Sequence, residues 1–142
     1  MKVMPETISI TTEQNEQFID ITKQVRDVVT RSAVRHGMLV VNSLHTTVAL
    51  FVNEFQSALI HDLGAVLQKW VPRRDGYRHD DPAYSDCDRE NGHAHLRSML
   101  LGRSVALPVA GGEMVLGQYQ SIILAELDGP RDRSVSIQAV GV

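Results

Sequence analysis

The sequence predicts an α+β fold, and three features of the chain support this. Short runs rich in valine, isoleucine and threonine recur toward both ends, which is typical of strands. Two longer stretches, residues 18–37 and 54–71, repeat their apolar residues at the spacing of a helix. No internal repeat, low-complexity segment or linker divides the chain, so we expect a single domain over residues 1–142.

The composition of the chain argues against some classes of binding partner. At 142 residues and 43% hydrophobic content, one compact domain can bury roughly two-thirds of its unfolded surface. A net charge of −3 and an aromatic fraction of 5% argue against a nucleic-acid partner. The single cysteine, Cys87, fits a reducing compartment, and no apolar run has the length of a signal peptide core or a membrane span. We therefore expect a soluble cytoplasmic protein without a membrane partner.

The first predicted strand and helix follow each other near the start. Residues 6–12, ETISITT, alternate isoleucine with polar residues, which indicates a half-buried strand. Residues 18–37 then change to the helical period, with an apolar stripe made of Val25, Val28, Val29 and Ala33. We expect Thr22 to cap this helix and Gly37 to end it in a left-handed turn.

The next segment predicts a pair of strands and a second helix. Residues 39–44 and 47–52 are two β-type runs, and His45 interrupts them where strand chemistry favours valine or isoleucine. After them, Asn53 is placed to cap a helix over residues 54–71 that Pro72 ends. Strand propensity does not explain a histidine between two core strands, so His45 is the first candidate for a functional residue.

The second half of the chain predicts a long loop, a short helix and a strand-rich end. Residues 73–92 contain few apolar side chains and many turn formers, and a loop of this length is usually functional or disordered. Residues 93–102, HAHLRSMLLG, predict a helix ended by Gly102. The remaining runs predict strands at residues 104–109, 114–117, 121–127 and 134–142.

Candidate metal ligands occur in three places. They are His45, then His79 with Asp80, Asp81, Asp86 and Asp88, then His93 and His95. Imidazoles from different elements can converge on zinc, nickel or copper. His93 and His95 point about 200° apart on a helix, so we do not expect them to share one ion. The alternative is a solvated acidic surface with scattered histidines.

A second candidate is the segment LDGPRDR, residues 127–133. Asp128 and Gly129 start a turn as a strand ends, and Pro130 fixes the backbone before Arg131. A guanidinium on a rigid corner suits a phosphate or carboxylate ligand. The alternative is a structural ion pair that closes the turn.

The order of motifs along the chain resembles the YjbQ family, described as secondary thiamine-phosphate synthases. The resemblance lies in HTT.AL..NE, Y.H, NGHAHL...LLG.SV.LPV..G...LG.Q and ELDGPR.R.V, and it covers nearly the whole chain. It is carried by His45, Thr46, Thr47, Ala49, Leu50, Asn53, Glu54, Tyr77, His79, Asn91, His95, Gly102, Pro108, Gln120, Glu126, Asp128, Gly129, Pro130 and Arg131. One departure is GQYQ where the family usually has GTWQ, so Gln118 and Tyr119 put substrate stacking at that position in doubt.

The resemblance implies a YjbQ-like α+β subunit with mixed or antiparallel, β-sandwich-like sheets and three helices, assembled as a homotrimer. It implies a pocket at or beside a subunit interface, which His45 would face instead of the core. The implied catalytic residues are His45, Glu126 and Arg131. The implied substrate-binding residues are Thr46, Thr47, Asn53, Glu54, Gln120, Asp128 and Arg131, and the implied metal ligands are His45, His79 and His95.

Two functions from different classes stay open at the level of sequence. The first is a thiamine-phosphate synthase-like enzyme that joins an aminopyrimidine diphosphate to a thiazole phosphate, as a weak activity because the chain lacks a glycine-rich phosphate cradle. The second is a trimeric protein that binds a metal or a small anionic ligand, with a different reaction or none. Three imidazoles favour zinc as the divalent ion, whereas diphosphate chemistry favours magnesium.

Overall fold

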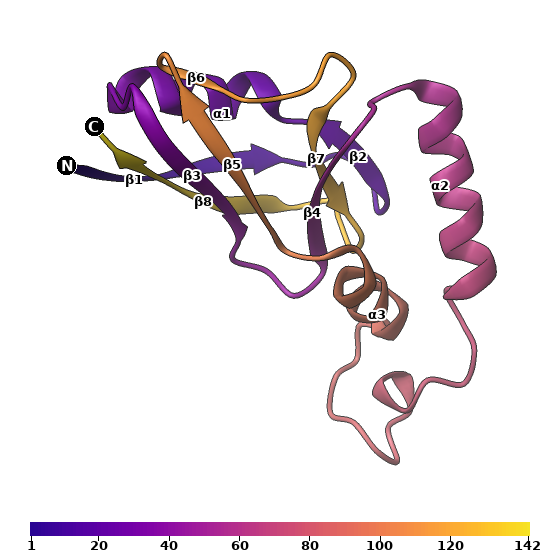
Figure 1. Cartoon of the computed structure of the whole chain (residues 1–142). Coiled ribbons are helices and arrows are strands. Elements are labelled where there is room, and N and C mark those ends of the chain that lie inside the picture. Colours follow the sequence, from indigo (N-terminus) through magenta and orange to yellow (C-terminus); the bar gives the residue numbers. More distant parts are fainter.

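The computed structural model describes all 142 residues and has two antiparallel sheets with three α-helices (Figure 1). The five-stranded sheet has the order β1-β8-β3-β5-β6, and the three-stranded sheet has the order β2-β7-β4. The strands are β1 (Lys2–Thr11), β2 (Gln17–Asp20), β3 (His36–Ser43), β4 (Val48–Asn53), β5 (Ser104–Ala110), β6 (Glu113–Met114), β7 (Ser121–Glu126) and β8 (Asp132–Gly141). The predicted α+β class with sandwich-like sheets is confirmed.

The main core lies between the sheets and the first helix, α1 (Thr22–Ser32). Strand β8 buries every second residue, from Arg133 to Ala139, as a half-buried strand should. Strand β7 is instead buried along almost its whole length, because it is the central strand of its sheet. The apolar face of α1, with Val25, Val28 and Val29, closes this core.

The two strands around His45 do not pair with each other, so the predicted strand pair is wrong. Strand β3 pairs with β5 and β8, whereas β4 pairs with β7 in the other sheet. Residues 44–47 therefore carry the chain from one sheet to the other. A histidine in this crossing segment does not interrupt the hydrogen bonds between paired strands. The residue preferences of strands therefore do not apply there.

The ends of α1 differ from the prediction. Thr22 is its first helical residue, and its backbone N–H and hydroxyl both donate to the Asp20 carboxylate, at 3.0 and 2.5 Å. At the other end Ala33 takes the left-handed conformation, with φ of 56°. Gly37 lies inside β3, where a side chain would overlap the carbonyl of Val140.

The second helix, α2 (Ser57–Trp70), starts later than predicted. Gln56 is its cap and accepts a 2.8 Å hydrogen bond from the backbone N–H of Leu59. Asn53 instead ends β4, and its side chain accepts from the N–H of Glu54 at 2.8 Å. Helix α2 stands at one side of the molecule (Figure 1), and of its apolar stripe only Leu67 is buried.

The long loop is confirmed, with one 3-10 turn, η1 (Arg78–Asp80). Helix α3 (Gly92–Leu101) follows it and ends at Gly102, as predicted. Strand β6 has only two residues, so the predicted strand over 114–117 is largely wrong. None of the helices combines the length and the apolar character that crossing a bilayer requires.

Candidate functional site

His45 is held in the crossing segment by two hydrogen bonds. Its Nε2 accepts from the backbone N–H of Ser134, at 2.8 Å, and its own backbone N–H donates to the hydroxyl of Ser43, at 3.2 Å. Burial lowers the pKa of His45, and the positive charge of Arg133 adds to that effect. The neutral ring therefore carries its proton on Nδ1, because Nε2 is an acceptor.

A cavity of about 430 Å³ opens beside this ring. Its lining consists of His45, Thr46, His95, Ser98, Met99, Gly102 and Arg103. Of these, Ser98 is already engaged, since its hydroxyl donates to the carbonyl of Val48 at 2.7 Å. The polar groups of the cavity are thus two imidazoles, an exposed threonine and an arginine, which give it a net positive charge, while most of its surface consists of carbon atoms. We call it the His45 pocket.

The other two predicted metal ligands lie against each other. The ring centroids of His79, from η1, and His95, from α3, are 4.7 Å apart at an interplanar angle of 54°. The Nδ1 atom of His79 is buried without a hydrogen-bond partner, although it lies 3.5 Å from the Asp80 carboxylate. Burial is the main cause that lowers the pKa of His95, and His79 lowers it further. His93 is buried and does not line the His45 pocket.

Three histidines do not form a ready metal site in the single chain. No group of three or more His, Cys, Asp or Glu side chains has an arrangement that could hold an ion. The donor set fits only in part, because Nε2 of His45 is occupied by Ser134 while His79 and His95 offer an adjacent pair. We therefore derive no chemical step through a metal ion.

Glu126 forms a closed ion pair with Arg133 and does not line the pocket. Both side chains are buried, and Arg133 donates to the carboxylate through Nε at 2.8 Å and through a terminal nitrogen at 2.5 Å. The hydroxyl of Thr12 and the N–H of Asp128 complete the carboxylate's partners. Despite its burial, these hydrogen bonds and the arginine lower the pKa of Glu126. Such a carboxylate positions its neighbours and has no oxygen free for a ligand.

Thr47 belongs to the same buried network. It is buried, and its hydroxyl accepts from Arg133 at 2.9 Å. Thr46, its neighbour in the chain, is exposed and lines the pocket. The two adjacent threonines thus have different roles, and only Thr46 is placed to contact a ligand.

Asp128 joins the LDGPR corner to the long loop. A single oxygen, Oδ2, accepts from Asn91 at 2.8 Å, from Arg89 at 3.0 Å and from Arg131 at 3.2 Å. These hydrogen bonds and charges lower the pKa of Asp128 even though its burial acts in the opposite direction. Arg89 has no place in the sequence prediction, since no local pattern links it to a carboxylate 39 positions away.

The backbone of the corner is closely surrounded by other atoms. A side chain at Gly129 would lie 2.5 Å from the carbonyl of Gln14 and 2.7 Å from Cγ of Glu126, so only glycine fits. The backbone N–H of Arg131 donates to the hydroxyl of Thr12 at 3.0 Å. The Gly129–Pro130 bond is cis. Arg131 therefore leaves the corner from a fixed backbone, and about a third of its side chain is exposed.

Three predicted substrate-binding residues do not join this site. Asn53, Glu54 and Gln120 lie at the far end of the β4–β7 pair, where Asn53 faces Ser121, whereas Val48 faces Glu126 at the near end. Five residues of strand separate the two ends, which is roughly 17 Å. Gln120 accepts from the N–H of Gly117 at 2.7 Å and closes a local turn. Within one chain these residues cannot contact a ligand in the His45 pocket.

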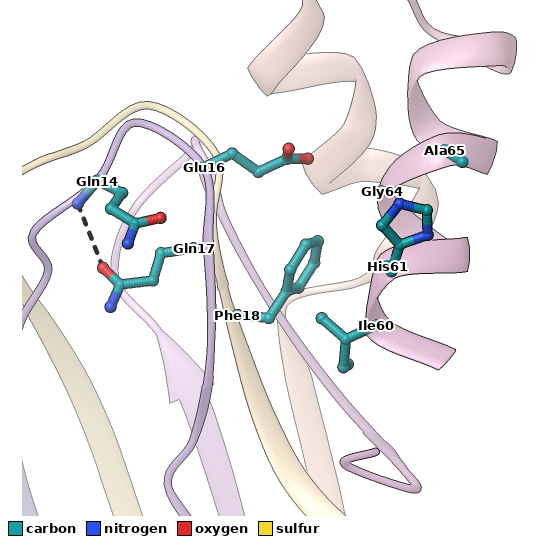
Figure 2. A pocket seen from close by; sticks show the side chains of 8 residues that line it. All are labelled: Gln14, Glu16, Gln17, Phe18, Ile60, His61, Gly64 and Ala65. Atoms are coloured by element: carbon teal, nitrogen blue, oxygen red, sulfur yellow. Dashed lines mark hydrogen bonds between the residues drawn. The ribbon is translucent and has the colours of Figure 1, made fainter. Parts of the chain in front are cut away.

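Another surface cavity, of about 610 Å³, is also elsewhere. It lies between α2 and the segment around β2, and Figure 2 shows Glu16 and Phe18 extending toward α2, which carries Ile60 and His61, whereas Gln17 points back toward Gln14. Glu16 is already paired with Arg97, at 3.3 Å, and His61 is almost fully exposed. This groove reflects how loosely α2 packs, and it contains no cluster of reactive groups.

Comparisons with known proteins agree on the family. The family model for UPF0047 protein YjbQ-like matches residues 6–142. The chain belongs to the YjbQ family. Among its relatives, a UPF0047 protein of Methanothermobacter thermautotrophicus is 39% identical over 141 residues, which cover 99% of this chain and 94% of the relative.

Solved structures of the YjbQ family share the fold throughout. A YbjQ-like protein of unknown function from Sulfolobus solfataricus is 31% identical, with a TM-score of 0.91 and 99% of each chain covered. An uncharacterised YjbQ/UPF0047 protein from Clostridium acetobutylicum is 34% identical, with a TM-score of 0.85, and covers 95% of this chain and 99% of its own. Neither of these two proteins is described with a reaction.

Proposed function

We propose that the chain binds a small phosphorylated ligand in the His45 pocket. The hydrogen bond from Ser134 to Nε2 of His45 carries this proposal, because it leaves Nδ1–H as the group that the ring offers to a ligand. A neutral donor, the Thr46 hydroxyl and the permanent charge of Arg103 together suit an anion. Arg103 has no carboxylate partner in the chain, so its charge is available.

A weak condensation of an aminopyrimidine diphosphate with a thiazole phosphate is the reaction that we assign to this pocket. In that step the thiazole nitrogen forms a bond to the methylene carbon of the pyrimidine. The carbon–oxygen bond to the diphosphate breaks, and pyrophosphate leaves with the electron pair. The Nδ1–H of His45 and the cations nearby would stabilise charge on the leaving group. The family resemblance supports this reaction, and the absence of a glycine-rich phosphate cradle supports a low rate.

Calorimetric titration with inorganic phosphate tests the pocket. We expect binding by the unaltered chain and at least a tenfold loss in His45→Ala, the size of one charge-assisted hydrogen bond. His61→Ala is the matched control, because it removes an exposed imidazole on α2. Equal affinity in both variants, or no binding by the unaltered chain at millimolar phosphate, contradicts the proposal. Formation of thiamine phosphate by the same three proteins then tests the reaction.

A divalent metal site is the second candidate function. It is favoured by the contact of His79 with His95 and by the buried Nδ1 of His79, which has no hydrogen-bond partner. Zinc suits the imidazole pair, and His45 would join as a third ligand only through Nδ1 or by giving up Ser134. Zinc analysis of dialysed protein tests it, because this candidate requires about one equivalent that is lost in His79→Ala. Less than a tenth of an equivalent after reconstitution removes this candidate.

A further inference from the structure

We infer that Arg89 and Arg131, held together by Asp128, bind the second phosphoryl group of a diphosphate whose first phosphoryl group occupies the His45 pocket. This inference rests on the proposed anion pocket and adds the residues that hold the second phosphoryl group of such a ligand. It also gives a role to Arg89, which the sequence did not single out.

The geometry of the arginine pair is fixed by one atom. Both guanidinium groups donate to Oδ2 of Asp128, Arg89 at 3.0 Å and Arg131 at 3.2 Å. Asn91 donates to the same oxygen at 2.8 Å, and Asp128 is buried, so this carboxylate has little freedom to move. Two cations that would otherwise repel each other are therefore held side by side by groups from two separate segments of the chain.

The guanidinium groups of this cluster are only partly used. Both share the Asp128 carboxylate, and the neighbouring Asp88 adds negative charge beside Arg89. Arg89 uses only Nε, and Arg131 uses only one terminal nitrogen, so most of their N–H groups have no partner in the chain. The side chains of Arg89 and Arg131 are 51% and 35% exposed, and these free groups can reach a ligand. A phosphoryl group, with its several acceptor oxygens, matches such a forked donor set.

The cluster adjoins the His45 pocket. Asn91, which donates to Asp128, accepts through its backbone carbonyl from the N–H of His95 at 3.2 Å. Ser134, three residues after Arg131, donates from its backbone N–H to His45 at 2.8 Å. Both hydrogen bonds thus join the cluster to residues that line the pocket. A ligand with two linked phosphoryl groups can therefore span the pocket and the arginine pair, whereas inorganic phosphate can occupy only one of them.

The competing explanation is that Asp128 simply fastens the long loop to the corner. In that case Arg89 stabilises the fold and has no part in binding. If Arg89 only fastens the loop, its removal affects the binding of a diphosphate and of a monophosphate alike. If Arg89 binds a phosphoryl group, its removal weakens the binding of the diphosphate more.

Calorimetric titration with pyrophosphate and with phosphate separates them. We expect the unaltered chain to bind pyrophosphate more tightly than phosphate. Arg89→Ala should lower pyrophosphate affinity by roughly 10- to 100-fold and leave phosphate affinity within about twofold. Arg74→Ala is the matched control, since Arg74 lies in the same loop, pairs with Glu90 and is largely exposed. It should leave both affinities unchanged.

The outcomes that overturn the inference are distinct from those that overturn the pocket. If phosphate binds but pyrophosphate binds no more tightly, or if Arg89→Ala weakens both ligands equally, the arginine pair is not a phosphoryl site. Absence of phosphate binding overturns the proposed function instead. If Arg89→Ala does not fold, Arg89→Lys decides, because it keeps a cation beside Asp128 without the fork. Unchanged pyrophosphate affinity in Arg89→Lys also overturns the inference.

Discussion

The Nε2 atom of His45 accepts a hydrogen bond from the backbone of Ser134, 89 positions further along the chain. This contact fixes the tautomer of a side chain that lies where the chain passes between the two sheets. Since β8 begins two residues before Ser134, the strand that pairs with both β1 and β3 also orients the ring. The orientation of His45 in the candidate site thus depends on one backbone N–H of β8.

Stability should depend on pH through three histidines. Burial lowers the pKa values of His45, His93 and His95 below the ordinary 6.5. The unfolded chain then binds more protons than the native chain once the pH falls below 6.5, so the free energy of unfolding decreases from there until the lowered native pKa values are passed. Urea unfolding at pH 8, 7, 6 and 5 measures this.

Two variants test whether buried histidines cause the loss of stability at acidic pH. His93→Gln should reduce the decline in stability between pH 7 and 5, whereas the exposed His61→Gln should leave it unchanged. Glu126 and Asp128 have lowered pKa values, so their contribution is lost only in more acidic solution, below their ordinary values of 4.5 and 3.8. A decline that is identical in His93→Gln and the unaltered chain contradicts the assignment.

The Glu126–Arg133 pair should be costly to break from one side. Arg133→Met leaves a buried carboxylate without its cation, and we expect a loss of about 3–5 kcal/mol in the free energy of unfolding. The double variant Arg133→Met with Glu126→Leu removes both charges and should recover much of that loss. Denaturant unfolding of the two variants measures the difference. A double variant as unstable as the single one would show that the pair is not the cause.

Gly64→Ala should stabilise the chain. Gly64 lies inside α2, and a methyl group there would meet no other atom within 4 Å. Alanine favours a helix interior over glycine by about 0.5–1 kcal/mol. Thermal unfolding at a fixed protein concentration measures the gain. A loss of stability instead would show that another molecule packs against this face of the helix in solution.

The homotrimer stays a prediction, and α2 indicates where to test it. Phe55, Leu59, Val66 and Trp70 are exposed apolar residues along or beside this helix. Light scattering should give three times the subunit mass of 15.8 kDa at micromolar concentration. Leu59→Asp should lower that mass, whereas His61→Asp, on the opposite side of the helix, should not. A monomer mass for the unaltered chain contradicts the prediction.

The local sequence pattern identifies helices and strands, but it does not show which strands pair with each other. The spacing of Val25, Val28 and Val29 identified α1, because one face of a helix has to meet the core. Its end was missed because Ala33 takes a left-handed conformation that normally marks glycine. The pairing of β3 with β8, and not with β4, depends on residues almost a hundred positions apart, and no neighbouring residue encodes that choice.

In the candidate site, too, some residues can be predicted from the sequence and others cannot. The corner at Gly129 and the importance of His45 could be inferred from turn chemistry, from an unusual residue between strands and from the family resemblance. The cluster around Asp128 could not, because Arg89 looks like any charged loop residue until the fold brings the corner to it. Asn53 and Glu54 were placed at a helix start by their cap-like chemistry, whereas the helix begins only at Ser57.

The pairing of β1 with β8 also governs how the chain can mature on the ribosome. Lys2 faces Gly141 and Thr11 faces Asp132, so β1 has no partner in the sheet until β8 has been synthesised. Until then β1 presents unpaired backbone to other nascent chains, and the entropy cost of bringing the two strands together is large. The β1–β8 pair thus cannot form before residues 132–141 have left the ribosome, and a ribosome stalled before residue 132 should hold a chain that proteases and holdase chaperones recognise.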